Sequence, residues 1–302
     1  MIIDLEKEKI SLKEALDKAN PHDIILLENK TYHEKITLNK PYITLKGKEN
    51  SIIEFDACHK KIIPLELDGD GTKKYGTTGS STFRLLPLAH DFICYNVTFL
   101  NSHPKYIHEK GAQAVSFKTE ADNTRLYNCK IISYQDTFYV DDCKNNLFYN
   151  CYILGDIDFI FGSGEALFQN CIIENVKDKV YGYFTASSTY IDYEYGLTFN
   201  ECKFISNMYS PLGRRWYPGG ATKPIYPREC FINCNFIGNI LLEYVSMNEK
   251  DPYEGDMLFN NCIHNDIKIK NDNIDKYYDF IQTILNKYKG EYIWLISTNL
   301  AF

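Results

Sequence analysis

Residues 126–174 read LYNCKIISYQDTFYVDDCKNNLFYNCYILGDIDFIFGSGEALFQNCIIE and contain one local segment three times. The copies LYNCKII (126–132), FYNCYIL (148–154) and FQNCIIE (168–174) each place Asn before Cys and alternate large apolar with polar residues. Such alternation is typical of a β-strand, whereas a helical repeat would show a period of about 3.6 residues. The stretch therefore predicts short strands that recur along the chain in a common register.

Further copies of this segment lie on both sides of the stretch: CYNVTFL at 94–100, FNECKFI at 199–205, FINCNFI at 231–237 and FNNCI at 259–263. Counted at the Cys position, which Val97 occupies in the first copy, the intervals are 32, 22, 20, 31, 32 and 28 residues. They are shorter than propeller blades of about 40–50 residues, and their irregularity suits a coil whose loops vary in length. We predict an all-β fold, a right-handed parallel β-helix, in which residues 1–302 form one domain.

Two segments predict helices. The first runs over about 11–19, where Ser11 and Glu14 match a capping box. The second runs over about 274–289, where apolar residues share one face and Gly290 is expected to close the helix. Because the open ends of a β-helix expose strand edges, we expect these helices to cap its two ends. Long loops are expected at 68–82, 101–112 and 206–229.

The composition excludes some classes of protein. The chain has 302 residues with a net charge of −7, so it lacks the basic balance of a nucleic-acid binder. No stretch of 18 uncharged apolar residues is present, so we expect no membrane span. The start of the chain shows no basic region followed by an apolar one, which predicts a cytoplasmic protein, or a secreted one if a signal has been removed.

The ten cysteines have the positions of packing residues. Cys129, Cys151, Cys171, Cys234 and Cys262 each follow Asn within the repeat. Free Cys behaves as a small buried hydrophobe, and a chain of this length does not need disulfides for stability. We expect free thiols in the core. Neither a CxxC pair nor a Cys/His cluster with zinc spacing occurs in the sequence, so no metal site is predicted.

Two carboxylates occupy the same point of consecutive repeats. Asp136 and Asp158 are 22 positions apart, and each follows its cysteine, Cys129 or Cys151, by seven. In stacked strands they become neighbours, and two close carboxylates cannot both ionise freely. One carboxyl tends to hold a proton while the other stays charged. The charged carboxylate could then act as a nucleophile and the protonated one as a general acid. Most Asp residues in such segments are turn formers or solvated charges, so the flanking sequence has to decide.

The flanking sequence resembles the pectin methylesterase family of aspartyl carbohydrate esterases, which are built on a right-handed β-helix. The segments that carry the resemblance occur in the family's order: KTYHEK (30–35), STF (81–83), GAQAV (111–115), YQDTFYV (134–140) with GDIDFIFG (155–162), and LGRRW (212–216). Without this resemblance, we would interpret Gln113 and Gln135 as surface amides. Arg214 would be interpreted as a solvated cation and Trp216 as a core residue.

The resemblance implies a role for each matching residue. Asp158 is expected to attack the C6 methyl ester of a galacturonate unit, and Asp136 to protonate the departing methanol. Arg214 is expected to hold Asp158, while Gln113 and Gln135 donate to the oxyanion. The residues expected to line the sugar subsites are Thr82, Phe83, Gln113, Tyr139, Phe161, Arg214 and Trp216.

The resemblance further implies a monomeric enzyme that acts on pectin or methylated oligogalacturonides without a metal or organic cofactor, and with neither nucleic acid nor membrane as partner. Three alternatives stay open. A polygalacturonase or lyase could use the same scaffold, although neither residue set can be assembled here. A non-catalytic β-helix could bind glycans. A related esterase or thioesterase could act on another acyl group, because the catalytic core says little about the acyl partner.

Overall fold

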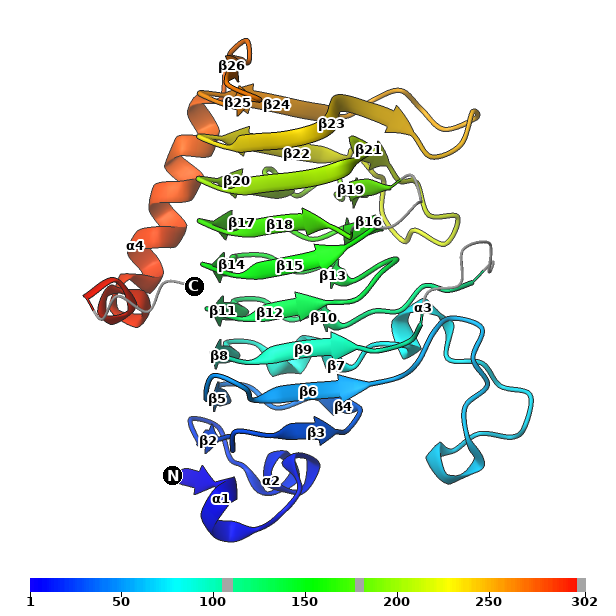
Figure 1. Ribbon diagram of the computed structural model, residues 1–302, viewed down its shortest axis with the longest axis vertical. Coiled ribbons are helices and arrows are strands. Elements are labelled where there is room, and N and C mark those ends of the chain that lie inside the picture. The colour runs from blue at the N-terminus through cyan, green and yellow to red at the C-terminus, as the bar shows by residue number, and fades with distance from the viewer. Residues whose placement is uncertain (105–110, 177–181, 298–302) are drawn as a thin grey trace.

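The structure is a computed structural model that describes residues 1–104, 111–176 and 182–297. Short parallel strands stack coil upon coil along the long axis (Figure 1). The first sheet has ten strands, one above the other. They are β1 (Ile2–Asp4), β2 (Ile24–Leu26), β5 (Thr44–Lys46), β8 (Ile93–Tyr95), β11 (Arg125–Tyr127), β14 (Asn146–Tyr149), β17 (Ala166–Gln169), β20 (Leu197–Asn200), β22 (Arg228–Ile232) and β24 (Asp256–Asn260).

The second sheet consists of two columns that β21 (Lys203–Arg215) joins. One column contains β3 (Thr31–His33), β6 (Ile52–Phe55), β9 (Thr98–Asn101), β12 (Lys130–Ile132), β15 (Tyr152–Gly155) and β18 (Ile172–Asn175). The other contains β4 (Ile36–Leu38), β7 (Phe83–Leu85), β10 (Phe117–Thr119), β13 (Phe138–Val140), β16 (Ile157–Gly162) and β19 (Tyr183–Ser187). Beyond β21 follow β23 (Asn235–Ser246), β25 (Ile263–His264) and β26 (Ile267–Lys268).

Equivalent positions of successive sequence repeats lie beside each other in neighbouring strands. Leu126 lies beside Phe148, and Phe148 beside Phe168, all in parallel strands. The residue before the Cys position, which is Asn in every repeat except the one at 199–205, where it is Glu201, turns the chain from the first sheet into the second. Asn128 and Asn150 adopt left-handed conformations with φ of 53° and 52°, which Asn tolerates better than most residues. The predicted parallel β-helix is confirmed.

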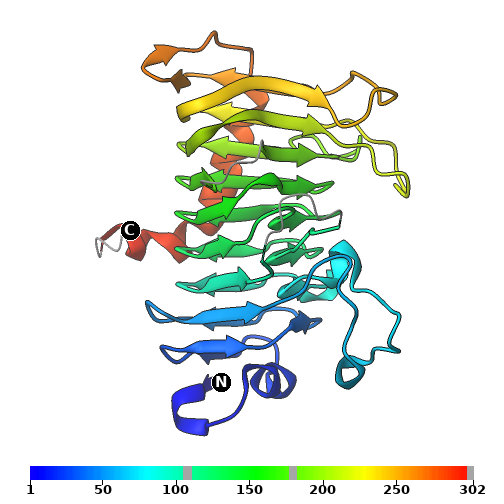
Figure 2. The same ribbon diagram turned by 45° about the vertical axis from the view of Figure 1, so that its right-hand side comes forward.

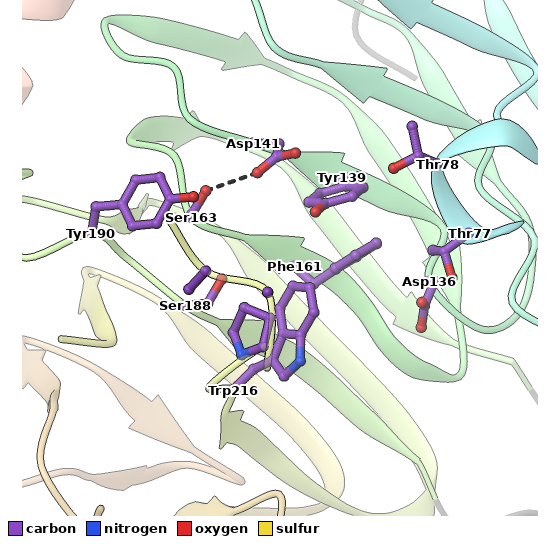
Figure 3. Close-up of a pocket in the computed structure, with 13 residues that line it drawn as sticks. Thr77, Thr78, Asp136, Tyr139, Asp141, Phe161, Ser163, Ser188, Tyr190 and Trp216 are labelled. Carbon is purple, nitrogen blue, oxygen red and sulfur yellow. Dashed lines mark hydrogen bonds between the residues drawn. The ribbon is translucent and has the colours of Figure 1, made fainter. Parts of the chain in front are cut away.

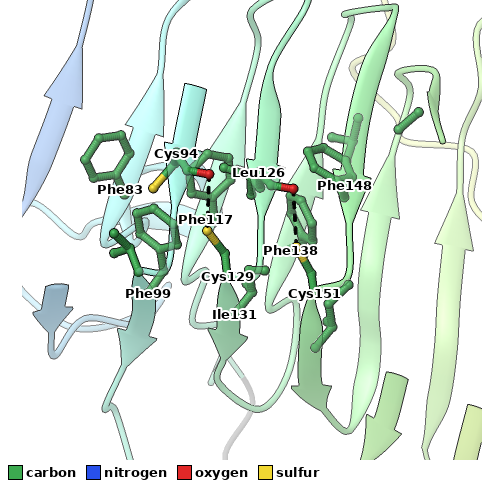
Figure 4. Packing of buried hydrophobic residues seen from close by; sticks show 14 of the residues in the cluster. Phe83, Cys94, Phe99, Phe117, Leu126, Cys129, Ile131, Phe138, Phe148 and Cys151 are labelled. Atoms are coloured by element: carbon green, nitrogen blue, oxygen red, sulfur yellow. Dashed lines mark hydrogen bonds between the residues drawn. The ribbon is translucent and has the colours of Figure 1, made fainter. Parts of the chain in front are cut away.

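The interior between the sheets is filled by stacked aromatic, aliphatic and thiol side chains (Figure 4). All ten cysteines are buried and unpaired, as expected. The Cys129 thiol donates to the Cys94 carbonyl at 3.7 Å and the Cys151 thiol to the Leu126 carbonyl at 3.5 Å. Each repeat thus contributes one small side chain to a ladder that continues through the core.

The helices are α1 (Leu5–Glu8), α2 (Leu12–Lys18), α3 (Gly76–Gly79) and α4 (Asp275–Ser297), with 3₁₀ turns at Leu65–Leu67 and Pro87–Ala89. The helix expected at 11–19 is confirmed as α2, and Ser11 Oγ accepts from the Glu14 N–H at 3.0 Å. None of the helices within the described residues is long and apolar enough to cross a membrane.

The C-terminal helix exists, but its length and position differ from the prediction. Gly290 lies inside α4, which continues to Ser297. The helix runs along the outer face of the first sheet instead of over the end of the coil (Figure 1), and in Figure 2 it lies behind the stacked strands. Its buried residues pack against Tyr127, Leu167 and Ile232. Packing of this kind outweighs the roughly 1 kcal/mol that a glycine costs inside a helix.

The three expected loops are only partly loops. Segment 68–82 contains α3, and residues 105–110 of the second loop lie outside the described residues. In the third, β21 continues to Arg215 and β22 begins at Arg228, so only 216–227 connects strands. The irregular pairing of β21 with β23, which shifts register between Ser206 and Ser210, hides this long strand from a period-two pattern.

Candidate active site

Asp136 and Asp158 lie at matching points of adjacent coils on the β4–β19 column. Phe138 of β13 pairs with Ile160 of β16, and the Asp136 N–H donates to the Ile157 carbonyl at 3.0 Å. Both aspartates adopt left-handed backbone conformations, with φ of 61° and 51°. Non-glycine residues with positive φ are uncommon, and such conformations cluster at functional sites. The spacing of the two carboxylates in the sequence is thus reproduced in space.

Arg214 holds Asp158 in a two-pronged ion pair. It projects from the end of β21, where Arg214 pairs with Ala186 of β19. Its Nε donates to Asp158 Oδ1 at 2.8 Å, and its Nη2 donates to Oδ2. The guanidinium carbon lies 4.1 Å from the centre of the Tyr183 ring, which supports the fork from the other side. Asp158 is only 5% exposed, so this pair is shielded from water.

The two carboxyl groups differ in their affinity for a proton. Burial raises the pKa of Asp136 well above its ordinary value, and the charge of Asp158 raises it further. Burial also raises the pKa of Asp158, but the hydrogen bonds and charge of Arg214 oppose that rise. Because Arg214 binds Asp158 directly, we assign the anion to Asp158 and the shared proton to Asp136.

A pocket of about 370 Å³ opens beside Asp136. Its floor is aromatic: the rings of Tyr139 and Phe161 stack with centres 4.1 Å apart, and Trp216 lies 5.7 Å from Phe161. In Figure 3 these rings lie between Asp136 at one end and Asp141 at the other. An aromatic surface flanked by polar groups is a typical setting for the apolar faces and hydroxyls of a sugar.

The glutamines lie next to this site but do not line the pocket. The segment of Gln113 runs beside that of Gln135, because the Ala114 N–H donates to the Gln135 carbonyl at 3.0 Å. The Gln135 side chain hydrogen-bonds to Asp136. Within residues 1–104, 111–176 and 182–297, the side-chain oxygen of Gln113 is buried without a hydrogen-bond partner. The Gln113 side chain therefore makes no hydrogen bond to the described residues through its oxygen.

The structure corrects the expectation for Thr82 and Phe83. Both side chains are fully buried. The Thr82 hydroxyl donates to the Leu100 carbonyl at 3.0 Å, and the Phe83 ring stacks on Phe117 in the core. Neither side chain lines a sugar subsite, because the outward residue of β7 is Arg84.

Several pocket residues were missed in the sequence. Asp141 lies two positions after Tyr139, and Ser163 two positions after Phe161, so each continues the outward-facing side of its strand. This spacing was the signal that could have identified them. Gly162 lets the chain turn here: its φ is +126°, and a Cβ would meet the Val140 carbonyl at 2.0 Å. The remaining missed residues come from other elements, namely Thr77, Thr78, Ser188, Tyr190, Pro218, Gly220 and Ala221.

The site's polar groups are carboxyls, amides, hydroxyls and the guanidinium of Arg214. Among the described residues, no group of three or more His, Cys, Asp or Glu side chains is placed to hold a metal ion. The arrangement offers one anionic carboxylate, one neighbouring acid and nearby amides beside an aromatic floor. These groups suit acyl transfer through a carboxylate nucleophile.

Comparison with known proteins identifies the family. The model of the pectinesterase family matches residues 6–218. The chain belongs to this family. Putative pectinesterase 63 of Arabidopsis thaliana is 36% identical over 200 residues, which are 64% of this chain and 54% of the relative. This chain spans about half the length of the curated pectinesterases that it matches.

Solved pectin methylesterases share the fold over a larger part of the chain. The enzyme from Yersinia enterocolitica is 26% identical with a TM-score of 0.73, and the match covers 89% of this chain and 96% of that one. A pectin methylesterase in complex with hexasaccharide VII has a TM-score of 0.75 at 24% identity, covering 89% of this chain and 90% of that one. The second match shows the fold alone.

Proposed function

We propose that this pectinesterase-family protein hydrolyses the C6 methyl esters of galacturonate units in pectin or pectic oligosaccharides and releases methanol. It acts as a monomer, through one catalytic domain over residues 1–302 and without a cofactor. The observation that carries the proposal is the pair Asp136–Asp158, with Arg214 forked onto Asp158 alone. Membership of the pectinesterase family and the fold shared with a hexasaccharide-bound pectin methylesterase support the substrate class.

In the first step, an Asp158 oxygen attacks the ester carbonyl and the carbonyl oxygen becomes an oxyanion. The amides of Gln113 and Gln135 stabilise this oxyanion as hydrogen-bond donors. Asp136 gives its proton to the departing methoxide, and methanol leaves. Arg214 keeps the attacking carboxylate ionised and oriented before the bond forms.

In the second step, water hydrolyses the acyl-enzyme, which is an anhydride between Asp158 and the galacturonate. Asp136 is now ionised and takes a proton from the attacking water, so the same group acts first as acid and then as base. Hydroxide attacks the sugar carbonyl and Asp158 leaves as a carboxylate. The cycle returns Asp136 to its protonated form, which its raised pKa favours.

The test is methanol release from highly methylated polygalacturonate by wild type and by Asp158→Asn, which keeps the shape of the side chain and removes its charge. Release that is lost in the variant supports the proposal. Asp91→Asn is the matched control, because Asp91 also pairs with an arginine, Arg125 at 3.2 Å, but away from the pocket. It should release methanol at the wild-type rate.

Two results would contradict the proposal. Folded wild type that releases no methanol from polymer or from short methylated oligomers would point to another ester, or to a coil that only binds glycans. Release that survives in Asp158→Asn would exclude Asp158 as the nucleophile.

A further inference from the structure

The end of the pocket away from Asp136 has a polar group that the proposed reaction does not use. Asp141 lies there just past β13, and its side chain is 21% exposed. Ser163 Oγ donates to Asp141 Oδ1 at 2.8 Å (Figure 3), and Tyr190 lines the same end. Asp141 thus presents a fixed carboxylate to whatever occupies the pocket beyond the aromatic floor.

A buried cation lies beside this carboxylate, and it also donates to Thr78 Oγ1 at 3.0 Å. Lys118 of β10 is 2% exposed, and its Nζ is 2.8 Å from Asp141 and 3.3 Å from Glu120. The same ammonium group lies 4.1 Å from the centre of the Tyr139 ring. Arg84 in turn pairs with Glu120 through two hydrogen bonds of 2.6 and 2.9 Å. Since the cation is buried and the anion is partly exposed, the pair directs its negative end towards the pocket.

The cation at the rim is already engaged. Lys223 lies 4.8 Å from the centre of the Tyr190 ring, but it pairs with Asp142 at 2.8 Å and approaches Asp192 at 3.9 Å. Among the described residues that line the pocket, two are acidic and none is Lys or Arg. The lining therefore provides hydrogen-bond acceptors but no cation that could bind a carboxylate.

From this charge arrangement we propose that Asp141 is a specificity-determining residue, which selects a methyl-esterified sugar unit over a free galacturonate in the unit next to the reacting one. The inference rests on the proposed function and names the neighbouring unit that the site prefers. Asp141 accepts hydrogen bonds from the hydroxyls of the bound sugar. A methyl ester at that unit is neutral, whereas a free carboxylate meets the negative end of the Asp141–Lys118 pair and is repelled.

The experiment compares two hexagalacturonates, one methylated on every unit and one methylated on a single internal unit. For wild type we expect kcat/KM per ester to be about tenfold higher on the fully methylated hexamer. In Asp141→Asn this ratio should fall to about twofold, because the amide keeps the shape and one acceptor oxygen but loses the charge. The ratio is taken within one protein, so a loss of folded molecules cancels.

Asp122→Asn is the matched control, since Asp122 caps the Lys144 N–H at 2.8 Å and does not line the pocket. Its ratio should equal that of wild type. Equal rates per ester on the two hexamers, a preference for the singly methylated one, or an unchanged ratio in Asp141→Asn would each overturn the inference while leaving ester hydrolysis intact. Absence of methanol from both hexamers would refute the proposed function itself, and the inference with it.

Discussion

One forked arginine–carboxylate pair on the first sheet of this β-helix can be compared with one on the second sheet. On the first sheet, Arg125 of β11 donates to both oxygens of Glu291 in α4, at 3.1 and 3.0 Å. On the second sheet, Arg214 makes the same kind of fork with Asp158. Both arginines are largely shielded from water, with side chains 7% and 19% exposed. The pairs are chemically alike, but their surroundings differ.

Helix α4 covers the first pair, in which a second carboxylate shares the arginine and no open pocket adjoins it within the described residues. Arg125 also bonds to Asp91, while the Tyr127 hydroxyl donates to Glu291 at 2.9 Å. The second pair faces another carboxyl, Asp136, whose pKa the charge of Asp158 helps to raise. Where such an ion pair is covered, as Arg125–Glu291 is, it holds a helix against the sheet. It creates a nucleophile only where a protonated acid and an open pocket adjoin it.

Removing one arginine at a time tests most directly whether the two pairs have different roles. Arg214→Gln should lower kcat/KM for methanol release by about 10³-fold, because buried Asp158 then loses the cation that favours its ionised form. The remaining activity should require a higher pH, since the pKa of Asp158 rises further without Arg214. The measurement is a pH–rate profile. A variant that keeps a tenth or more of the rate at every pH would exclude this role.

Glu229 connects the two faces and gives the next largest effect. It belongs to β22 of the helix-covered sheet, but its fully buried side chain points inward and accepts from Thr185 Oγ1 at 2.9 Å, behind the strand of Arg214. Burial raises its pKa to about 8. A carboxyl whose pKa is raised on folding contributes stability that is complete at low pH and is lost as the pH rises through the folded value.

The stability of wild type should therefore fall between pH 5 and pH 8 by about 3 kcal/mol more than that of Glu229→Gln, whose amide does not titrate. Urea unfolding at four pH values measures this difference. Asp136 and Asp158 titrate in both proteins, so their contributions cancel. Exposed Glu243→Gln is the control and should follow wild type. Parallel stability curves for wild type and Glu229→Gln would show that Glu229 does not titrate in this range.

Removing the other arginine should affect stability and leave catalysis unchanged. Arg125→Gln should lower the free energy of unfolding by about 2 kcal/mol, less than for a fully buried pair because Glu291 is 27% exposed and regains water. Methanol release per folded molecule should match wild type. Chemical unfolding and an active-site-normalised rate check both. A variant of unchanged stability but reduced rate would reverse the assignment of the two pairs.

The sequence revealed the fold because the repeat itself sets the register. The Asn–Cys step of most copies, as at Asn150–Cys151, places a turn and a core residue at the same point of the coil, and Asn96–Val97 and Glu201–Cys202 take the same place in the other two. Asp136 and Asp158 were found for the same reason. The extension of α4 past Gly290 was not predictable, because the contacts that stabilise it, such as Arg125–Glu291, join residues far apart in the chain.

The side of a strand was harder to predict than its position. Thr82 and Phe83 were expected to face a sugar, yet Arg84 faces outward, and three residues of alternation do not show which phase is buried. Lys118 and Asp141 were missed because their pairing needs β10 and β13 to lie side by side. Single residues on separate strands carry no joint signal in the sequence.

The smallest expected effect tests whether the two faces are independent. Asn150 lies at the turn between the sheets, where its amide donates to Asn128 Oδ1 at 2.7 Å and accepts from Asn170 at 3.3 Å. Asn150→Ala should cost about 1 kcal/mol through lost hydrogen bonds and a disfavoured positive φ, and Asn150→Gly should cost less because glycine adopts that φ freely. Urea unfolding measures both costs. Methanol release should stay at the wild-type rate, and a rate that falls in step with stability would mean that strain at the turn reaches Asp136 and Asp158 through the coil.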